Sequence, residues 1–254
     1  MKAEKWFAVS LLSASLLFTG IAAPANASAG PLQAAAENTG ITFTSKTMNS
    51  SAAEYEARIT YPVISGLADK TFEAQLNAEL EKYAADALTS MQRRSKEDAA
   101  IAKQQGYEFR PYVLDIAYKV HNTGKLLSFS VSHYEYTGGA HGMTNVTYYN
   151  IANLEKARKL QLSDLFQPGY DYRTVLNNLI KQQIALREQQ EDSLGYWFNG
   201  ISENQAFSFQ DGNLVIHFGQ YEIAPYAAGM PAFTIPKNQY ANLLKSDIRA
   251  LLQN

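Results

Sequence analysis

Apolar and polar residues alternate along several stretches of the chain, and this period of two is typical of strands with one buried face. Residues 41–48 and 54–63 show it first, and in the second stretch Tyr55, Ile59 and Tyr61 share one face. Further strands are predicted at residues 112–120, 126–136, 144–151 and 232–235, with a hairpin across residues 207–218 that turns at Asp211-Gly212.

From Asp69 the period changes to that of a helix, because apolar residues recur at helical spacing on one stripe. The stripe consists of Phe72, Leu76, Leu80, Tyr83 and Leu88. Gly106 is the expected end of this helix, and residues 95–98 predict a restart or a kink within it. Two more helices are predicted, one from about residue 171 and a closing one over residues 237–252, with Tyr240, Leu244, Ile248 and Leu251 facing inward.

The stretch 126–136 has two contrasting faces. One face carries Leu127, Phe129, Val131, His133 and Glu135, and the other carries Ser128, Ser130 and Ser132, which we expect to be solvated. Strand pairs joined by short turns, with helices between the groups, predict an α+β fold of antiparallel sheets covered by helices. We expect two lobes, residues 41–106 and 108–254, which either share one sheet or pack side by side.

The beginning of the chain is typical of an export signal. Lys2 and Lys5 precede an apolar run, and small-residue cleavage patterns follow it, so residues 1–27 are predicted to be a signal peptide. The alternative is a retained membrane anchor, since the apolar run approaches the length of a spanning helix. Residues 28–40 are small and polar and predict a flexible linker.

Composition and charge narrow the classes of function. The chain is 46% hydrophobic and 12% aromatic, which indicates a globular protein. It has no cysteine, so its stability depends on its core and not on disulfides. The formal net charge of −2 argues against nucleic acid as a partner, since proteins that bind it concentrate basic residues on one face, and it would suit a basic partner.

The turn at residues 136–142 concentrates unusual backbone demands around one histidine. Tyr136, Thr137, Gly138 and Gly139 lead to His141, and Gly142 follows it. Glycine is used where φ is positive or where another part of the chain approaches closely. The turn should therefore present the imidazole of His141 on a shaped loop.

A second loop, residues 221–229, combines aromatic rings with a rigid proline. Its candidate residues are Tyr221, Glu222, Pro225 and Tyr226. Exposed tyrosines are enriched at protein interfaces. The alternative is that these rings pack beneath the loop.

Histidines and carboxylates in the β-rich half raise the question of catalysis or metal binding. The candidates are His121, His133, His141, His217, Glu135 and Glu222. Their spacing matches no established metal motif, and no nucleophile elbow occurs. We therefore predict no catalytic residues, no metal and no cofactor. A general acid or base role for Glu135 near His133, or for Glu222, competes with hydrogen-bonded pairs that hold a loop.

Four segments taken together resemble a known family. Residues 133–142 (HYEYTGGAHG), 160–166 (LQLSDLF) and 221–229 (YEIAPYAAG) look like the extracellular domain of the RsiV-type anti-sigma factors. The same domain of unknown function occurs beside the catalytic domain of PdaC-type peptidoglycan deacetylases. Residues 61–67 (YPVISGL) and the helical stripe after them resemble the companion domain that precedes it.

The resemblance implies a secreted binding module of the bacterial cell envelope, because RsiV uses this region to hold lysozyme. We expect the module to stand without sigma-binding or membrane-signalling parts, and to be extracellular, wall-associated or, behind an outer membrane, periplasmic. The expected partner is lysozyme or a peptidoglycan component, with no nucleic acid and no membrane span after signal removal. The expected contact residues are Tyr136, Thr137, Gly138, Gly139, His141, Tyr221, Glu222, Pro225 and Tyr226. The alternatives are a peptidoglycan hydrolase or deacetylase using His133, Glu135, His141 and Glu222, and a structural wall-associated domain.

Overall fold

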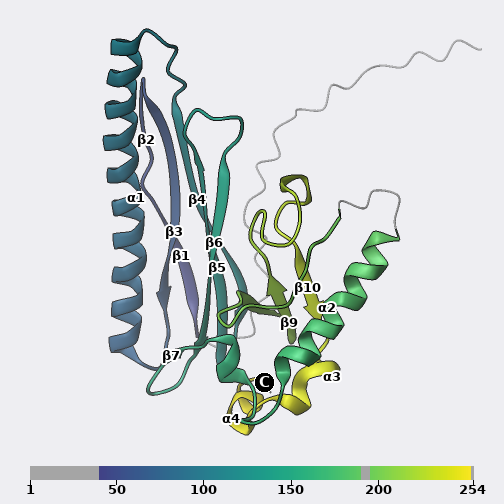
Figure 1. Cartoon of the computed structure of the whole chain (residues 1–254). Helices are drawn as coiled ribbons and strands as arrows, with labels where there is room; N and C mark the ends of the chain where they lie inside the picture. The colour runs from purple at the N-terminus through teal and green to yellow at the C-terminus, as the bar shows by residue number, and fades with distance from the viewer. Residues whose placement is uncertain (1–39, 190–194, 253–254) are drawn as a thin grey trace, which may run out of the picture. The chain divides into compact units, whose positions relative to one another are not determined.

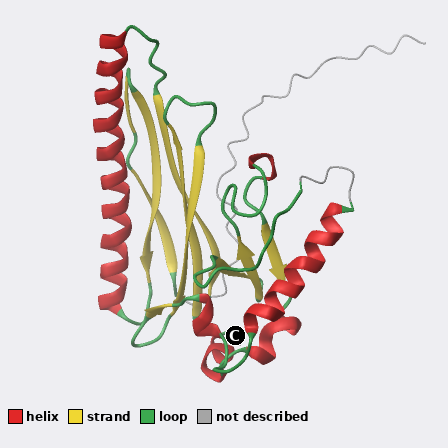
Figure 2. Ribbon diagram, viewed as in Figure 1, coloured by secondary structure: helices red, strands yellow, loops and turns green. Residues whose placement is uncertain are grey.

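The computed structural model describes residues 40–189 and 195–252. The predicted signal peptide, and the predicted linker up to residue 39, lie outside these residues. The described chain forms two sheets with helices beside them (Figures 1 and 2), which confirms the predicted α+β class.

The large sheet has the strand order β1-β3-β4-β5-β6-β7, with β2 also paired to β3. Its strands are β1 (Thr42–Thr47), β2 (Ser50–Ala52), β3 (Tyr55–Ser65), β4 (Tyr112–Thr123), β5 (Leu126–Tyr136), β6 (Met143–Ala152) and β7 (Arg158–Lys159). All neighbours are antiparallel except β3 and β4. That pair is parallel because a long helix carries the chain back between them. The two predicted lobes therefore share one sheet, and the boundary between residues 106 and 108 stays a prediction.

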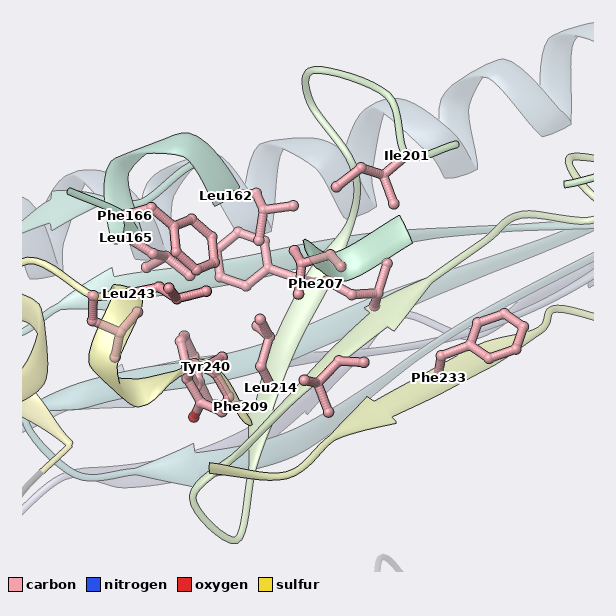
Figure 3. Packing of buried hydrophobic residues seen from close by; sticks show 14 of the residues in the cluster. Leu162, Leu165, Phe166, Ile201, Phe207, Phe209, Leu214, Phe233, Tyr240 and Leu243 are labelled. Carbon is pink, nitrogen blue, oxygen red and sulfur yellow. The ribbon is translucent and has the colours of Figure 1, made fainter. Parts of the chain in front are cut away.

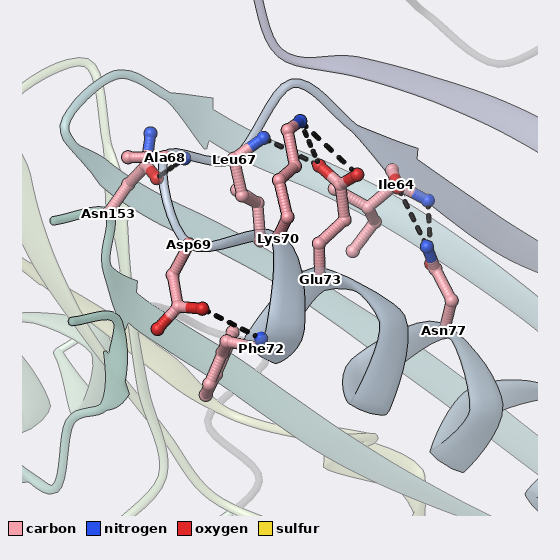
Figure 4. Close-up of polar contacts among 9 residues, drawn as sticks. All are labelled: Ile64, Leu67, Ala68, Asp69, Lys70, Phe72, Glu73, Asn77 and Asn153. Atoms are coloured by element: carbon pink, nitrogen blue, oxygen red, sulfur yellow. Dashed lines mark hydrogen bonds and ion pairs between the residues drawn. The ribbon is translucent and has the colours of Figure 1, made fainter. Parts of the chain in front are cut away.

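The helix between β3 and β4 is α1 (Lys70–Gln105), which runs along one face of the large sheet (Figure 1). Asp69 caps its start by accepting a hydrogen bond from the Phe72 amide at 3.0 Å (Figure 4). Gly106 ends it with φ at 76°, as predicted. The restart or kink predicted at residues 95–98 is wrong, because the helix is continuous there. Ser95 is fully buried, and its hydroxyl donates a hydrogen bond to the Gln92 carbonyl.

The small sheet has the order β10-β9-β8. It consists of β8 (Phe207–Gln210), β9 (Asn213–His217) and β10 (Ala232–Ile235). The turn between β8 and β9 has φ of 50° at Asp211 and 73° at Gly212, as a two-residue hairpin of the predicted kind requires. One face of this sheet packs with α2 (Tyr172–Glu188) and the 3₁₀ helix η1 (Leu162–Leu165) in one hydrophobic cluster. Figure 3 shows Phe207, Phe209 and Phe233 of the sheet together with Leu162 and Leu165 of η1.

The predicted closing helix over residues 237–252 is broken into three pieces. They are α3 (Lys237–Tyr240), the 3₁₀ helix η3 (Ala241–Leu243) and α4 (Ser246–Leu251). The break occurs because the backbone pairs elsewhere: the Lys245 amide donates to the Leu165 carbonyl at 2.9 Å, and Leu244 bridges Phe166. The inward positions of Tyr240, Leu244, Ile248 and Leu251 are nevertheless confirmed by their burial.

Both faces of β5 are covered. Leu127, Phe129 and Val131 pack in the core beneath α1. On the opposite face Ser128 and Ser130 are 0% and 7% exposed, so the expected solvated face is wrong there. The small sheet covers it: the Ser128 hydroxyl accepts a hydrogen bond from the Phe209 amide at 3.1 Å. Small polar side chains on this face let a second sheet come close.

Candidate partner-binding site

The turn after β5 is held by its own hydrogen bonds. The Tyr136 hydroxyl donates to the Gly139 carbonyl at 3.1 Å, and Arg110 donates to the same carbonyl at 3.5 Å. Gly138 has φ at +85°, a conformation that favours glycine. Thr137 and Gly139 are exposed at the tip of the turn.

Gly142 is required for a different reason. A Cβ atom placed there would lie 2.4 Å from the ring of Tyr134. The ring therefore occupies the space that a side chain would need. This close approach fixes the start of β6 against the end of β5, so that the turn has one defined shape.

The loop at residues 221–229 is braced by Glu222. Its carboxylate accepts hydrogen bonds from the Gly219 amide at 2.7 Å and from the Gln205 side chain at 3.1 Å. Pro225 then begins the 3₁₀ helix η2 (Tyr226–Ala228). Tyr221 has φ at 63°, which is uncommon for a residue with a side chain and indicates local strain held by the surrounding loop.

The two loops meet at His141. Its imidazole stacks on the ring of Tyr226, with centroids 4.0 Å apart, and its Nε2 lies 3.3 Å from the Tyr221 hydroxyl. The Tyr226 hydroxyl donates to the Gly142 carbonyl at 3.1 Å. Further along the loops, the Thr144 amide donates to the Gln220 side chain at 2.8 Å. Segments about eighty residues apart thus form one surface.

Exposed rings gather at this junction. His141 is exposed, Tyr221 is 47% exposed and Tyr226 is partly buried. Trp197, which the sequence analysis did not select, is 48% exposed, and its indole donates to the Glu222 carbonyl at 3.1 Å. We call His141, Trp197, Tyr221 and Tyr226 the aromatic surface. A signal for Trp197 was available, since it lies between Tyr196 and Phe198 in a short segment flanked by glycines.

The residues of the alternative hydrolase site are engaged in separate contacts. His133 and Glu135 face α1, where His133 Nδ1 lies 2.7 Å from the Tyr83 hydroxyl and Glu135 pairs with Arg94. Burial lowers the pKa of His133. Among the described residues, no hydrogen bond or ring contact joins this pair to His141 or Glu222. The carboxylate of Glu222 is instead occupied in holding its own loop.

The other two histidines lie between the sheets. His217 stacks on Tyr148 with centroids 4.0 Å apart, and the centroid of His121 is 6.4 Å from that of His217. Burial lowers the pKa of His121 to about 4 and that of His217 to about 3, so both imidazoles are neutral at pH 7. Within residues 40–189 and 195–252, no three histidine or acidic side chains are grouped so that they could hold a metal ion.

Two family models match the chain. Residues 48–144 match the family described as deacetylase PdaC, and residues 163–238 match a protein family of unknown function, DUF3298. The first match covers β2, β3, α1, β4 and β5, and the second covers most of η1, all of α2 and the small sheet.

Two characterised proteins of Bacillus subtilis are similar to this chain. The anti-sigma-V factor RsiV is 30% identical over 192 residues, which are 72% of this chain and 63% of RsiV. The peptidoglycan-N-acetylmuramic acid deacetylase PdaC is 20% identical over 192 residues, which are 74% of this chain and 38% of PdaC. The chain therefore spans less than two thirds of the length of either relative.

Solved structures show the same fold. A DUF3298 family member from Bacteroides fragilis superposes with a TM-score of 0.66 at 23% identity, covering 85% of this chain and 99% of that one. A DUF3298 family protein from Pseudomonas aeruginosa superposes with a TM-score of 0.54 at 19% identity, covering 82% of this chain and 95% of that one. In the part of the chain that the structure describes, no helix combines the length and apolar character needed to cross a bilayer.

The family matches cover the turn at residues 136–142 and the loop at residues 221–229, the two segments that meet at His141. Together with the similarity to RsiV and PdaC, they confirm the resemblance seen in the sequence: a region that matches the PdaC family model precedes a region that matches DUF3298.

Proposed function

We propose that the chain is a binding module of the cell envelope that holds a protein partner of the lysozyme kind on its aromatic surface. The observation that carries this proposal is the junction of the two loops, where His141 stacks on Tyr226 and bonds to Tyr221. The similarity to RsiV supports the class of partner. The net charge of −2 suits a basic protein such as lysozyme.

The contacts around the junction favour binding because the surface is formed before a partner arrives. Glu222 fixes the backbone of one loop through Gly219, and Gly142 fixes the other through Tyr134. A partner would therefore not need to order the loops, which lowers the entropic cost of association. Exposed Trp and Tyr rings bury large areas with little loss of side-chain freedom, and they are the residues that dominate interface energies.

The test is titration of the purified protein with lysozyme by calorimetry, followed by single substitutions. Tyr226→Ala and His141→Ala should each weaken binding about tenfold or more, since central aromatic anchors commonly contribute at this level. Tyr221→Asn removes an exposed ring while keeping a residue that tolerates positive φ. It should weaken binding without loss of folding.

The matched control is Tyr170→Ala, which removes a tyrosine that is 52% exposed outside both loops. Its affinity should equal that of the unchanged protein. The proposal fails if lysozyme does not bind, or if all three site variants bind as tightly as the control while their circular dichroism shows the native fold.

A deacetylase or hydrolase is the other candidate, and the similarity to PdaC favours it. The test is incubation with peptidoglycan, with and without zinc, and analysis of the released muropeptides. If the protein binds its partner and has no catalytic activity, the muropeptide profile should not change. A changed profile that is lost in His133→Ala and Glu135→Gln would establish the enzyme instead.

A further inference from the structure

A groove of about 550 Å³ opens between the two sheets. One wall comes from the large sheet through His121, Ser130 and Tyr148, and the other comes from the small sheet through His217 and Thr234. None of its lining residues belongs to the aromatic surface. Its volume lies within the roughly 300 to 1,000 Å³ of small-molecule sites.

The groove is lined by two imidazoles, and each has its Nε2 beside a serine hydroxyl. His217 Nε2 lies 2.8 Å from the Ser208 hydroxyl, and His121 Nε2 lies 2.9 Å from the Ser130 hydroxyl. His121 Nδ1 is buried and has no hydrogen-bond partner in the structure. A buried polar atom without a partner destabilises the fold.

The charged side chain that lines the groove is positive. Lys119 is the one lysine that lines it, and no aspartate or glutamate does. Among the described residues Lys119 makes no ion pair. Lys119 lines the same groove as His121 and His217. After burial its charge is a further cause that lowers the pKa of His121, and it acts on His217 after burial and the neighbouring His121.

We propose that this groove binds a small hydroxylated molecule that carries one oxyanion group, a carboxylate or a phosphate. Lys119 supplies the charge that such a group needs, and the imidazole nitrogens supply hydrogen bonds to it. The hydroxyls of Ser132 and Thr234 and the amide of Gln210 line the same space and suit the hydroxyls of the ligand. The side chains of Val146 and Val215 provide the apolar contact that such pockets share.

Binding should be linked to proton uptake. An anion beside an imidazole favours the protonated ring, so it raises the pKa of His121 and His217 from their lowered values. The rings face each other, and the other groups that face them are Lys119 on β4, Ser130 on β5, Tyr148 on β6 and Ser208 on β8, with Thr234 on β10 in the same groove. Since no carboxylate among them competes, affinity should increase as the pH falls from about 6 toward the values of about 4 and about 3 at which the rings of the free protein take up protons.

Three probes with the same sugar ring test the proposal: glucuronate, glucose 6-phosphate and glucose. Binding is followed by the NMR signals of the histidine side chains. At least one of the two acids should shift the signals of His121 and His217 to saturation, and glucose should bind about tenfold more weakly or not at all. A response to glucuronate alone identifies a carboxylate ligand, one to glucose 6-phosphate alone identifies a phosphate ligand, and equal responses show that the charge is what is recognised.

The variant Lys119→Met should reduce the affinity for the responding acid about tenfold. The control Lys96→Met removes another exposed lysine, on α1, and should leave the affinity unchanged. The proposal is overturned if neither acid moves the two histidine signals, if glucose binds as tightly as the acids, or if Lys119→Met binds like the control.

Discussion

At the scale of single residues, the three glycines near His141 have three different roles. Gly138 takes a positive φ of +85°, and Gly142 leaves space for the Tyr134 ring. Gly139 does neither, since the nearest atom to a Cβ built there is the His141 carbonyl oxygen at 3.9 Å. A cluster of glycines in a sequence indicates an unusual turn, but only the structure shows which glycine is needed for a positive φ and which for the close approach of a side chain.

The difference between Gly142 and Gly139 can be measured. Gly142→Ala should destabilise the protein by about 1–3 kcal/mol, because the new Cβ overlaps a ring that the surrounding strands hold in place. Gly139→Ala should change the free energy of unfolding by less than about 0.5 kcal/mol, as substitutions at open surface positions do. Urea denaturation of both variants tests this, and equal losses would show that the Tyr134 ring moves freely.

The histidines predict how stability depends on pH. In the folded protein burial lowers the pKa of His121 to about 4 and of His217 to about 3, while in the unfolded chain both groups titrate near pH 6.5. Below about pH 6.5 the unfolded state therefore binds more protons, so the protein should lose stability as the pH falls from about 7 to about 4. Urea midpoints across this range give the measurement. The variant His217→Gln should show a shallower loss, and an unchanged slope would contradict the assignment.

At the scale of elements, helix α1 is positioned by polar side chains at its start. Asn77 brackets one residue of β3: its Oδ1 accepts from the Ile64 amide and its Nδ2 donates to the Ile64 carbonyl, both at 2.8 Å (Figure 4). Glu73 accepts from the Leu67 amide at 2.7 Å. These bonds set the register of the helix along the strand, which apolar contacts alone would leave less defined.

Asn77→Ala should therefore cost about 1–3 kcal/mol, because it leaves the amide and carbonyl of Ile64 without these partners. The control is Gln75→Ala, an exposed position on the same helix, where alanine is a good helix former and little change is expected. Thermal denaturation of both variants provides the comparison. Equal melting temperatures would mean that water replaces the lost bonds.

At the scale of the whole molecule, a chain of buried hydrogen bonds fastens the small sheet to the large one. The Ser128 hydroxyl donates to Asn150 Oδ1 at 2.8 Å, and Asn150 Nδ2 donates to the Phe207 carbonyl at 2.7 Å. The Phe209 amide completes the chain by donating to Ser128. Buried networks of this kind are stable only while every member has its partner.

Replacing Asn150, the central residue of this chain of bonds, should weaken the attachment of the small sheet to the large one. Asn150→Ala should cost about 2–3 kcal/mol and speed hydrogen exchange in β8 and β9 more than in β4, since the bond to the Phe207 carbonyl is lost. Asn145→Ala, an exposed position on the same strand, is the matched control. Uniform acceleration over both sheets would show that they unfold as one unit.

Much of the secondary structure could be predicted because its signals are local. Asp69 and Gly106 bound α1, and Asp211-Gly212 forms the hairpin turn, through bonds and φ values that involve only near neighbours. The predicted solvated serine face was wrong, because burial of Ser128 depends on Phe209, which lies 81 positions later. The closing helix was broken for a similar reason, by pairing of Leu244 with Phe166.

In the candidate site, too, some features follow from the local sequence and others depend on contacts between distant segments. The sequence by itself determined which residues carry rings and which backbone positions require glycine, because these follow from residue type and local geometry. Only the tertiary structure decided that His141 stacks on Tyr226, that Trp197 adds to their surface and that His133 and Glu135 turn toward α1. These contacts join segments distant in the chain, and such contacts form only when the two sheets and the helix have packed.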